Sequence, residues 1–91
     1  MASAFAVEWF QVGDKWELVG TNNTGVDIHD VVPVRVPGGP AGNYPPVMAP
    51  NDRHTFRTVS TQPSPGHYDT YYNIGTDRFK CNNDTGEVTP L

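Results

Sequence analysis

The sequence predicts a single all-β domain with the architecture of a β-sandwich, built from about seven short strands, with a small β-barrel as the alternative. Apolar residues recur at every second position in residues 26–36, nine glycines and nine prolines interrupt the chain, and no segment shows helical periodicity over ten residues. A period of two places apolar groups on one face of a strand, whereas Gly and Pro disfavour helices. Short strands separated by turn signals are typical of sandwiches and small barrels.

The first part of the chain is predicted to form a β-hairpin. Residues 3–12 alternate in polarity, Gly13-Asp14 supplies a turn, and residues 15–20 alternate again. Two such runs joined by a short Gly-containing turn are typical of an antiparallel pair. The faces expected to be apolar carry Phe5, Val7 and Trp9 in the first run and Trp16 and Leu18 in the second.

Residues 26–36 are predicted to form a longer strand that follows the polar turn at residues 21–25. The spacing places one set of apolar side chains on a single face, broken only at Asp30: Val26, Ile28, Val32, Val34 and Val36. Pro33 cannot donate a ladder hydrogen bond, so the strand is expected to lie at a sheet edge there, to bulge, or to switch sheets. We expect one continuous run that bends or bulges near its middle.

Residues 37–50 are predicted to form a long loop without a regular element. The segment holds five of the nine prolines and three of the nine glycines, and neither residue favours a regular strand interior. A connection of this length in a compact domain is usually functional or disordered. Both alternatives remain open for this loop.

The remaining strands are short and are separated by Pro, Gly and Asn turns. They are expected at residues 52–60, 67–74, 78–82 and 87–89. The sequence shows no internal repeat and no composition shift that would mark a second domain. Residues 1–91 are therefore interpreted as one domain, large enough to fold around its own core.

Two short motifs carry a family resemblance. Asn23-Thr24-Gly25 leads into one strand, and Ala49-Pro50-Asn51-Asp52 leads into another that bears Thr55-Phe56. Together they resemble the middle of immunoglobulin-like β-sandwich modules of the bacterial and viral (phage structural) type, over roughly residues 15–60. The chain departs from antibody-type domains, which bridge two cysteines around a Trp. The resemblance implies a fold and a structural role, and it transfers no binding residues.

Charge and cysteine content exclude several classes of function. The net charge is −4 with only six Lys and Arg residues, which argues against binding to nucleic acid or to a membrane surface. The pairs Arg53/Arg57 and Arg78/Lys80 are interpreted as solvated strand positions. Cys81 is the only cysteine, so an intrachain disulfide and a Cys-based zinc site are excluded. With no signal-like or membrane-spanning apolar run, we expect the protein in a virion or in the cytoplasm.

Candidate chemistry in the sequence is sparse. Asp27/His29 and His67/Asp69 each place a carboxylate and an imidazole on one strand face, the ligand types that zinc and related ions accept. Outward faces of amphipathic strands explain the same pattern, so we expect no metal and no cofactor, although the two pairs could meet in space. A hydrolytic set of Ser60, His54 and Asp52, or Cys81 as nucleophile, lacks any activating motif. The protein is predicted not to be an enzyme.

Aromatic residues are the remaining functional signal. We expect Trp9, Trp16, Tyr68 and Tyr72 to fill the core, because the chain is short of Leu and Ile and each ring buries a large area. Tyr44 and Tyr71 are then the aromatic side chains left outside. Tyr44 lies on the Pro-rich loop, which loses little entropy on docking. The candidate interaction residues are Tyr44, Pro45, Pro46, Trp9, Trp16 and Tyr71.

The function predicted from these observations is contact with another protein. We expect a non-enzymatic structural module, an oligomer or a decorating or accessory subunit of a larger assembly such as a phage capsid or virion. The alternative is a small carbohydrate-binding module that uses Trp9, Trp16 or Tyr71 as a stacking platform.

Overall fold

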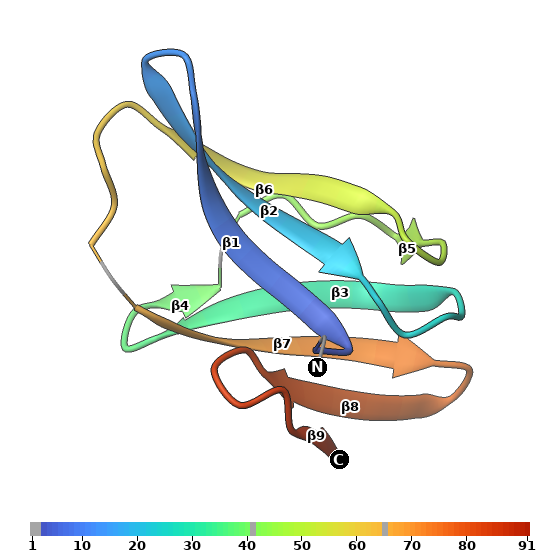
Figure 1. Cartoon of the computed structure of the whole chain (residues 1–91). Helices are drawn as coiled ribbons and strands as arrows, with labels where there is room; N and C mark the ends of the chain where they lie inside the picture. The colour runs from blue at the N-terminus through green and yellow to red at the C-terminus, as the bar shows by residue number, and fades with distance from the viewer. Residues whose placement is uncertain (1–2, 41, 65) are drawn as a thin grey trace.

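The computed structural model describes residues 3–40, 42–64 and 66–91, which form two antiparallel β-sheets facing each other (Figure 1). The first sheet has the order β1-β2-β6: β1 is Phe5–Val12, β2 is Lys15–Asn22 and β6 is Arg53–Val59. The predicted all-β sandwich is confirmed, since the described strands divide between two sheets rather than closing into one barrel. These ranges contain no helix long and apolar enough to cross a membrane.

The second sheet has the order β4-β3-β7-β8-β9, and β5 also pairs with β3. Its strands are β3 (Ile28–Val36), β4 (Gly39–Pro40), β5 (Val47–Met48), β7 (His67–Ile74), β8 (Asp77–Asn82) and β9 (Val88–Pro90). The expectation that residues 37–50 hold no regular element is wrong, because both two-residue strands lie in this segment. A two-residue strand needs few backbone hydrogen bonds to pair with β3. The prolines that lie between β4 and β5 do not interrupt either pairing.

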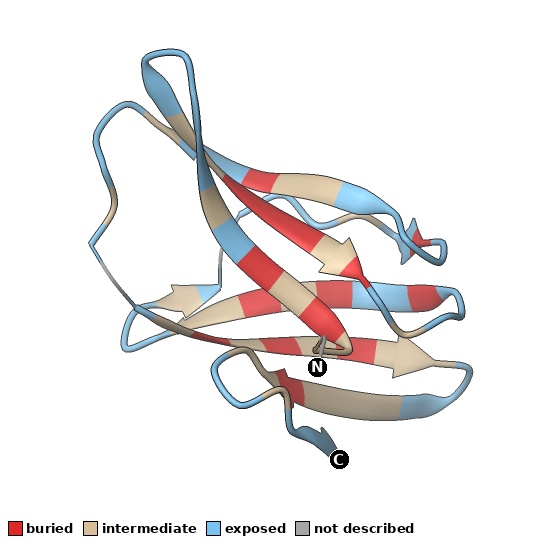
Figure 2. Cartoon of the chain, viewed as in Figure 1, coloured by how far each residue is buried: buried red, intermediate tan, exposed pale blue. Residues whose placement is uncertain are grey.

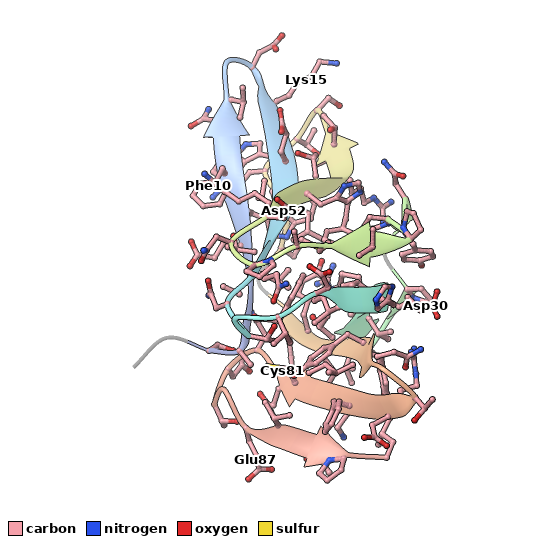
Figure 3. All side chains as sticks on the ribbon, turned by 90° about the vertical axis from the view of Figure 1, so that its right-hand side faces the viewer. Phe10, Lys15, Asp30, Asp52, Cys81 and Glu87 are labelled. Atoms are coloured by element: carbon pink, nitrogen blue, oxygen red, sulfur yellow. The ribbon has the colours of Figure 1, made fainter. Side chains whose placement is uncertain are left out.

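A tight turn fixes the register of the first hairpin. β1 and β2 pair from Phe5↔Asn22 to Val12↔Lys15, which leaves Gly13-Asp14 as the turn. Gly13 has φ +63°, and a positive φ at the first of two turn residues is the arrangement of a type II′ turn. The predicted hairpin is confirmed. Its tip points away from the second sheet, and Figure 3 shows Lys15 at the end of the molecule opposite Glu87.

The core lies between the sheets, along the middle of their strands (Figure 2). The first sheet contributes Phe5, Val7, Leu18 and Phe56, and the second contributes Ile28, Val31, Met48, Tyr68, Tyr72 and Cys81. The rings of Phe5 and Phe56 meet edge to face, with centroids 6.3 Å apart, a favoured geometry for aromatic pairs. Gly20 of β2 lies directly against both rings. The absence of a side chain at position 20 therefore allows the two rings to pack on the strand backbone.

Strand β3 does not present its apolar residues on one face as the spacing predicts. Ile28 and Val31 are fully buried, whereas Val32 is half-buried and Val36 is 46% exposed. Asp30 has φ +50°, and the pairing with β7 shifts register between residues 29 and 32. An extra residue in one strand inverts the alternation beyond it. The predicted bulge is confirmed, but the prediction that the apolar side chains of this strand share a single face is wrong.

Pro33 lies where β3 is a sheet edge, as one of the three predicted alternatives requires. β5 pairs with residues 28–29 of β3 and β4 with residues 34–35. Within the described part of the chain, no strand pairs with the outer edge of β3 at residues 31–33. The missing N–H of Pro33 therefore interrupts no continuous ladder on that side.

The buried side chain of Asn22 joins the two turns that carried the family resemblance. Its Nδ2 donates to the carbonyl oxygens of Val26, Met48 and Ala49 at 2.8, 3.0 and 3.0 Å, and its Oδ1 accepts from Thr24. The backbone N–H of Asn51 also donates to the Asn22 carbonyl. Buried polar groups need such partners. Asn22 therefore links the end of β2, in the first sheet, to β5 of the second sheet.

Candidate functional site

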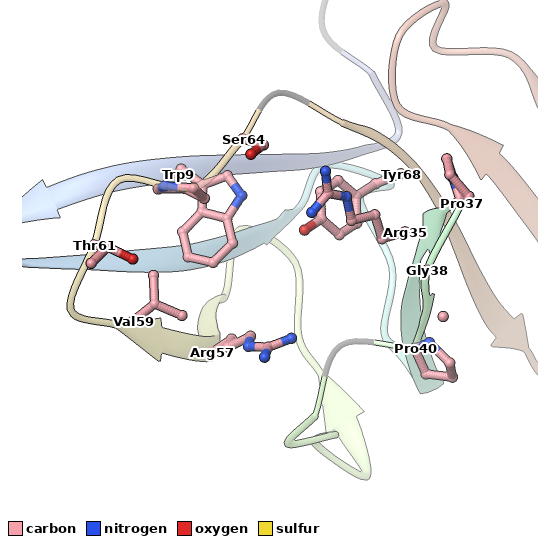
Figure 4. Close-up of a pocket in the computed structure, with 12 residues that line it drawn as sticks. Trp9, Arg35, Pro37, Gly38, Pro40, Arg57, Val59, Thr61, Ser64 and Tyr68 are labelled. Atoms are coloured by element: carbon pink, nitrogen blue, oxygen red, sulfur yellow. The ribbon is translucent and has the colours of Figure 1, made fainter.

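A cleft of about 400 Å³ opens between the two sheets at one end of the sandwich. Figure 4 shows Trp9, Val59 and Arg57 on one side and Tyr68 and Arg35 on the other. The rim comes from residues 37–40, which include β4, and from Thr61, Pro63 and Ser64 in the connection between β6 and β7. The volume falls within the range of roughly 300–1,000 Å³ that small-molecule sites occupy.

Trp9 reaches the cleft because the alternation of β1 continues past the core. Phe5 and Val7 are buried on the inner face, and Trp9 follows two residues later on that face. It packs against the core cluster but is only half-buried. Figure 1 shows the tip of the β1–β2 hairpin diverging from the second sheet, so the opposite strands do not cover the indole completely.

Arg35 reaches the cleft because of the bulge in β3. The inversion at Asp30 turns the odd-numbered residues after it inward, and Arg35 pairs in register with Tyr68 of β7. A Cβ at Gly66 would lie 2.6 Å from Arg35 Nε, so the side chain of Arg35 rests against the backbone there. Tyr68 is 8% exposed. The bulge, the register and Gly66 together hold this wall of the cleft.

The cleft is cationic although the protein is acidic. Two of the six Lys and Arg residues line it, and no Asp or Glu is among its described lining residues. Arg57 is exposed, and no described carboxylate lies within ion-pair distance of it. A guanidinium presents planar N–H donors that match a carboxylate. The arrangement can bind a ligand that combines an apolar face with a negative charge.

The structure distributes the predicted interaction residues over four places. Trp9 lines the cleft, and Tyr44, Pro45 and Pro46 lie in the connection between β4 and β5. Trp16 is half-buried in β2, in register with Val59 of β6. Tyr71 lies half-buried in β7 with the guanidinium carbon of Arg78 5.8 Å from its ring centroid.

The predicted aromatic core is correct in part. Tyr68 and Tyr72 are buried, and Tyr44 is 43% exposed. The prediction is wrong for Trp16, which is half-buried and outside the core cluster, and Trp9 packs only at the margin of that cluster. Fully buried phenylalanines, Phe5 and Phe56, take the central position instead. The divergence of the β1–β2 hairpin from the second sheet explains the difference, because residues toward its tip are only partly covered by the facing sheet.

The two His/Asp pairs do not converge on a metal site. β3 and β7 are neighbours, but their antiparallel register places His29 opposite Asn73 and His67 opposite Val36, at opposite ends of the pair. Residues 3–40, 42–64 and 66–91 contain no group of three His, Cys, Asp or Glu side chains suited to a metal ion.

His67 instead forms a double ion pair. Its Nδ1 lies 2.8 Å from Asp84 Oδ2 and its Nε2 lies 2.7 Å from Asp69 Oδ1. Both ring nitrogens face a carboxylate, so the protonated imidazole donates to both. The hydrogen bond with Asp84, followed by that with Asp69, raises the pKa of His67 above its ordinary value of 6.5. This cluster ties the β8–β9 turn to β7.

Three of the four residues considered for hydrolysis are engaged in other contacts. His54 Nε2 lies 3.1 Å from the Asn43 carbonyl oxygen, and Asp52 Oδ2 accepts from the backbone N–H of Ala49. Cys81 is fully buried, with its Sγ 3.2 Å from Ser3 Oγ. Among the described hydrogen bonds, none joins Cys81 to a histidine.

Sequence reasoning missed Arg35, Arg57 and Tyr68 as residues of one site. Arg57 was expected to be a solvated strand position, and it is exposed, but at the mouth of the cleft. The available signal was Asp30, whose interruption of the apolar spacing marks the bulge.

Comparisons of the chain with protein-family models, curated proteins and solved structures found no match. The immunoglobulin-like resemblance therefore stays a prediction.

Proposed function

We propose that the chain is a non-enzymatic module that contacts another protein within a larger assembly. The observation that carries this proposal is the way the segment around Tyr44 is held. Tyr44 and Val47 are 43% and 45% exposed, yet their segment is bonded to both sheets. His54 of β6 contacts the Asn43 carbonyl, and the N–H of Asp30 in β3 donates to the Pro46 carbonyl at 3.4 Å.

A segment fixed in this way is suited to an interface. Val47 pairs in register with His29, and the next residue, Met48, is 1% exposed and anchors β5 in the core. Pro45 and Pro46 further restrict the backbone. Exposed apolar side chains on a preorganised backbone lose little conformational entropy when a partner binds. Tyrosine is also enriched among the residues that dominate binding energy.

The assembly that we propose is a virus particle, with the chain as a decorating or accessory subunit of a phage capsid. The small single-domain size and the acidic composition support this setting, together with the resemblance to phage structural modules at residues 15–60. On the same grounds we propose that the protein resides in the virion or in the cytoplasm.

Native mass spectrometry and analytical ultracentrifugation test the proposal. We expect the wild-type protein to form a defined oligomer or a complex with a co-purifying protein. The double variant Tyr44→Ser, Val47→Ser should lose this association while keeping its β-sheet circular dichroism. Val36→Ser, a similarly exposed valine at 46%, serves as the matched control and should retain it. A monodisperse wild-type monomer without a partner at any concentration contradicts the proposal.

The second candidate function is carbohydrate binding, and the cleft at Trp9 favours it. Of the three platforms that the sequence suggested, Tyr71 is partly covered by Arg78 and Trp16 lies outside the cleft. Trp9 alone combines a partly open indole with a concave site. In a Trp16→Phe variant Trp9 is the only tryptophan, so a change of fluorescence on adding oligosaccharide reports on the cleft directly. No change with any saccharide would exclude this function.

A further inference from the structure

We propose that the cleft binds an acidic sugar unit, a pyranose ring that carries a carboxylate. The ring packs on the indole of Trp9, and the carboxylate pairs with the guanidinium of Arg57, with Arg35 adding positive charge from the opposite wall. This inference rests on the carbohydrate-binding function given above as the second candidate, and it names the ligand class of that site.

The electrostatics of the cleft select for a negative charge. Arg35 and Arg57 come from different sheets and both line the cleft, and no acidic side chain is among its described lining residues. The nearest acidic residue along β7 is Asp69, which follows Tyr68 and so faces the other side of the strand; it is paired with His67. An acidic ligand would therefore meet the exposed guanidinium of Arg57 and no opposing carboxylate among the described lining residues.

The aromatic surface of the cleft favours a pyranose. The indole of Trp9 is half-buried and borders the cleft, with Val59 beside it. The C–H face of a sugar ring covers such an aromatic surface, while its hydroxyls remain hydrogen-bonded at the edge. A cleft of about 400 Å³ accommodates one or two sugar rings with part of the surrounding water.

An acidic peptide fits the same cleft less well than an acidic sugar does. Peptides bound to β-domains usually add a strand to a sheet edge and use its backbone donors. Here the rim contains Pro37, Pro40 and Pro63, which have no N–H to offer. The ligand must therefore take its hydrogen bonds mainly from side chains. Arg57 can give a carboxylate two parallel N–H donors.

The experiment uses isothermal titration calorimetry with the wild-type protein and fluorescence titration with the Trp16→Phe variant. The probes are a panel of acidic oligosaccharides: tri-galacturonate, tri-glucuronate, tri-mannuronate and a sialylated trisaccharide. Their methyl esters keep the rings and remove the charge, so they serve as matched neutral ligands. Hexa-glutamate serves as the acidic peptide. Calorimetry on the wild type keeps the test valid if the Trp16→Phe variant is poorly folded.

Two substitutions on β6 provide a matched pair. Arg57→Gln removes the guanidinium at the cleft, and Arg53→Gln removes an exposed arginine of the same strand whose guanidinium lies over Phe10. We expect at least one acidic oligosaccharide to bind and to shift Trp9 fluorescence. Its methyl ester and the Arg57→Gln variant should each weaken binding by about tenfold or more. Arg53→Gln should leave the affinity unchanged.

The outcomes distinguish a failure of this inference from a failure of the carbohydrate-binding function on which it rests. Equal binding of an oligosaccharide and its methyl ester, or no effect of Arg57→Gln, overturns the acidic ligand class but leaves carbohydrate binding standing. Hexa-glutamate binding as tightly as the best saccharide overturns the sugar component. If no saccharide of either charge binds, both the inference and the carbohydrate-binding function are wrong.

Discussion

Replacing Gly20 with alanine should destabilise the fold through steric overlap alone. A Cβ at position 20 would lie 2.6 Å from Phe5 Cζ and 2.6 Å from Phe56 Cε2. Non-bonded carbon atoms rest at about 3.5–4.0 Å, so each ring would have to move by roughly 1 Å. Phe5 is 0% and Phe56 is 2% exposed. Neither ring can move without disturbing the core around it.

The expected change in the free energy of unfolding follows from two opposing contributions. Inserting a methyl group into a packed core costs typically about 1–3 kcal/mol. Gly→Ala also reduces the entropy of the unfolded chain and contributes about 0.4–1 kcal/mol in favour of folding. The net loss in the free energy of unfolding is therefore about 1–2 kcal/mol, and the midpoint of thermal unfolding should fall by roughly 4–16 °C for a domain of this size.

Urea and thermal unfolding followed by circular dichroism measure this loss. Gly42→Ala is the matched control, because its Cβ would meet no atom within 4 Å and its backbone is not in the left-handed region; its stability should not fall. In a Phe56→Leu background the cost of Gly20→Ala should shrink, since contacting residues couple. A Gly20→Ala variant as stable as the wild type, or a cost unchanged by Phe56→Leu, refutes the proposed packing.

Three further predictions test other parts of the structure. Asn22→Ala leaves buried carbonyl groups without a donor and should cost about 2–4 kcal/mol in urea unfolding, whereas the exposed Asn23→Ala should cost less than about 1 kcal/mol. Val31→Lys should abolish cooperative unfolding, and Val32→Lys should retain it; the reverse result would contradict the bulge in β3. Because the pKa of His67 is raised in the folded state, its stabilising contribution is fully present below pH 6.5 and is lost as the pH rises through the folded pKa. The unfolding midpoint in urea should therefore fall as the pH rises above 6.5, and His67→Gln should flatten that profile; an unchanged profile would show that the ion pairs do not contribute.

The strands with uninterrupted alternation could be predicted from the sequence. Residues 67–74 coincide with β7, and the expected strands at residues 3–12, 15–20 and 52–60 differ from the observed ones only at their ends. Each of these segments carries its own period and ends at a Gly, Pro or Asn turn. Local information is sufficient to place these strands, but it does not show the register shift between β2 and β6 at Leu18/Val19 or the successive burial of Leu18, Val19 and Gly20.

Strand β3 shows where local information fails. The valines at positions 32, 34 and 36 continue the spacing of Val26 and Ile28, and a regular strand would bury them all. Asp30 adopts a left-handed conformation, and its Oδ2 accepts a hydrogen bond from Asn73 Nδ2 at 3.1 Å. That contact comes from a residue far along the chain. The inversion therefore depends on the pairing with β7, which no local pattern specifies.

The composition of the cleft follows from the same inversion. Without the extra residue at Asp30, Arg35 would point away from the core and Val34 would take its place beside Tyr68. The opposite wall depends equally on non-local geometry, since the tip of the β1–β2 hairpin diverges from the second sheet and leaves Trp9 partly open. Neither feature stabilises the core, because the bulge holds a non-glycine residue at positive φ and the divergence leaves aromatic surface uncovered. The proposed binding of an acidic ligand depends on both features, because the bulge brings Arg35 to the cleft and the divergence exposes Trp9 in it.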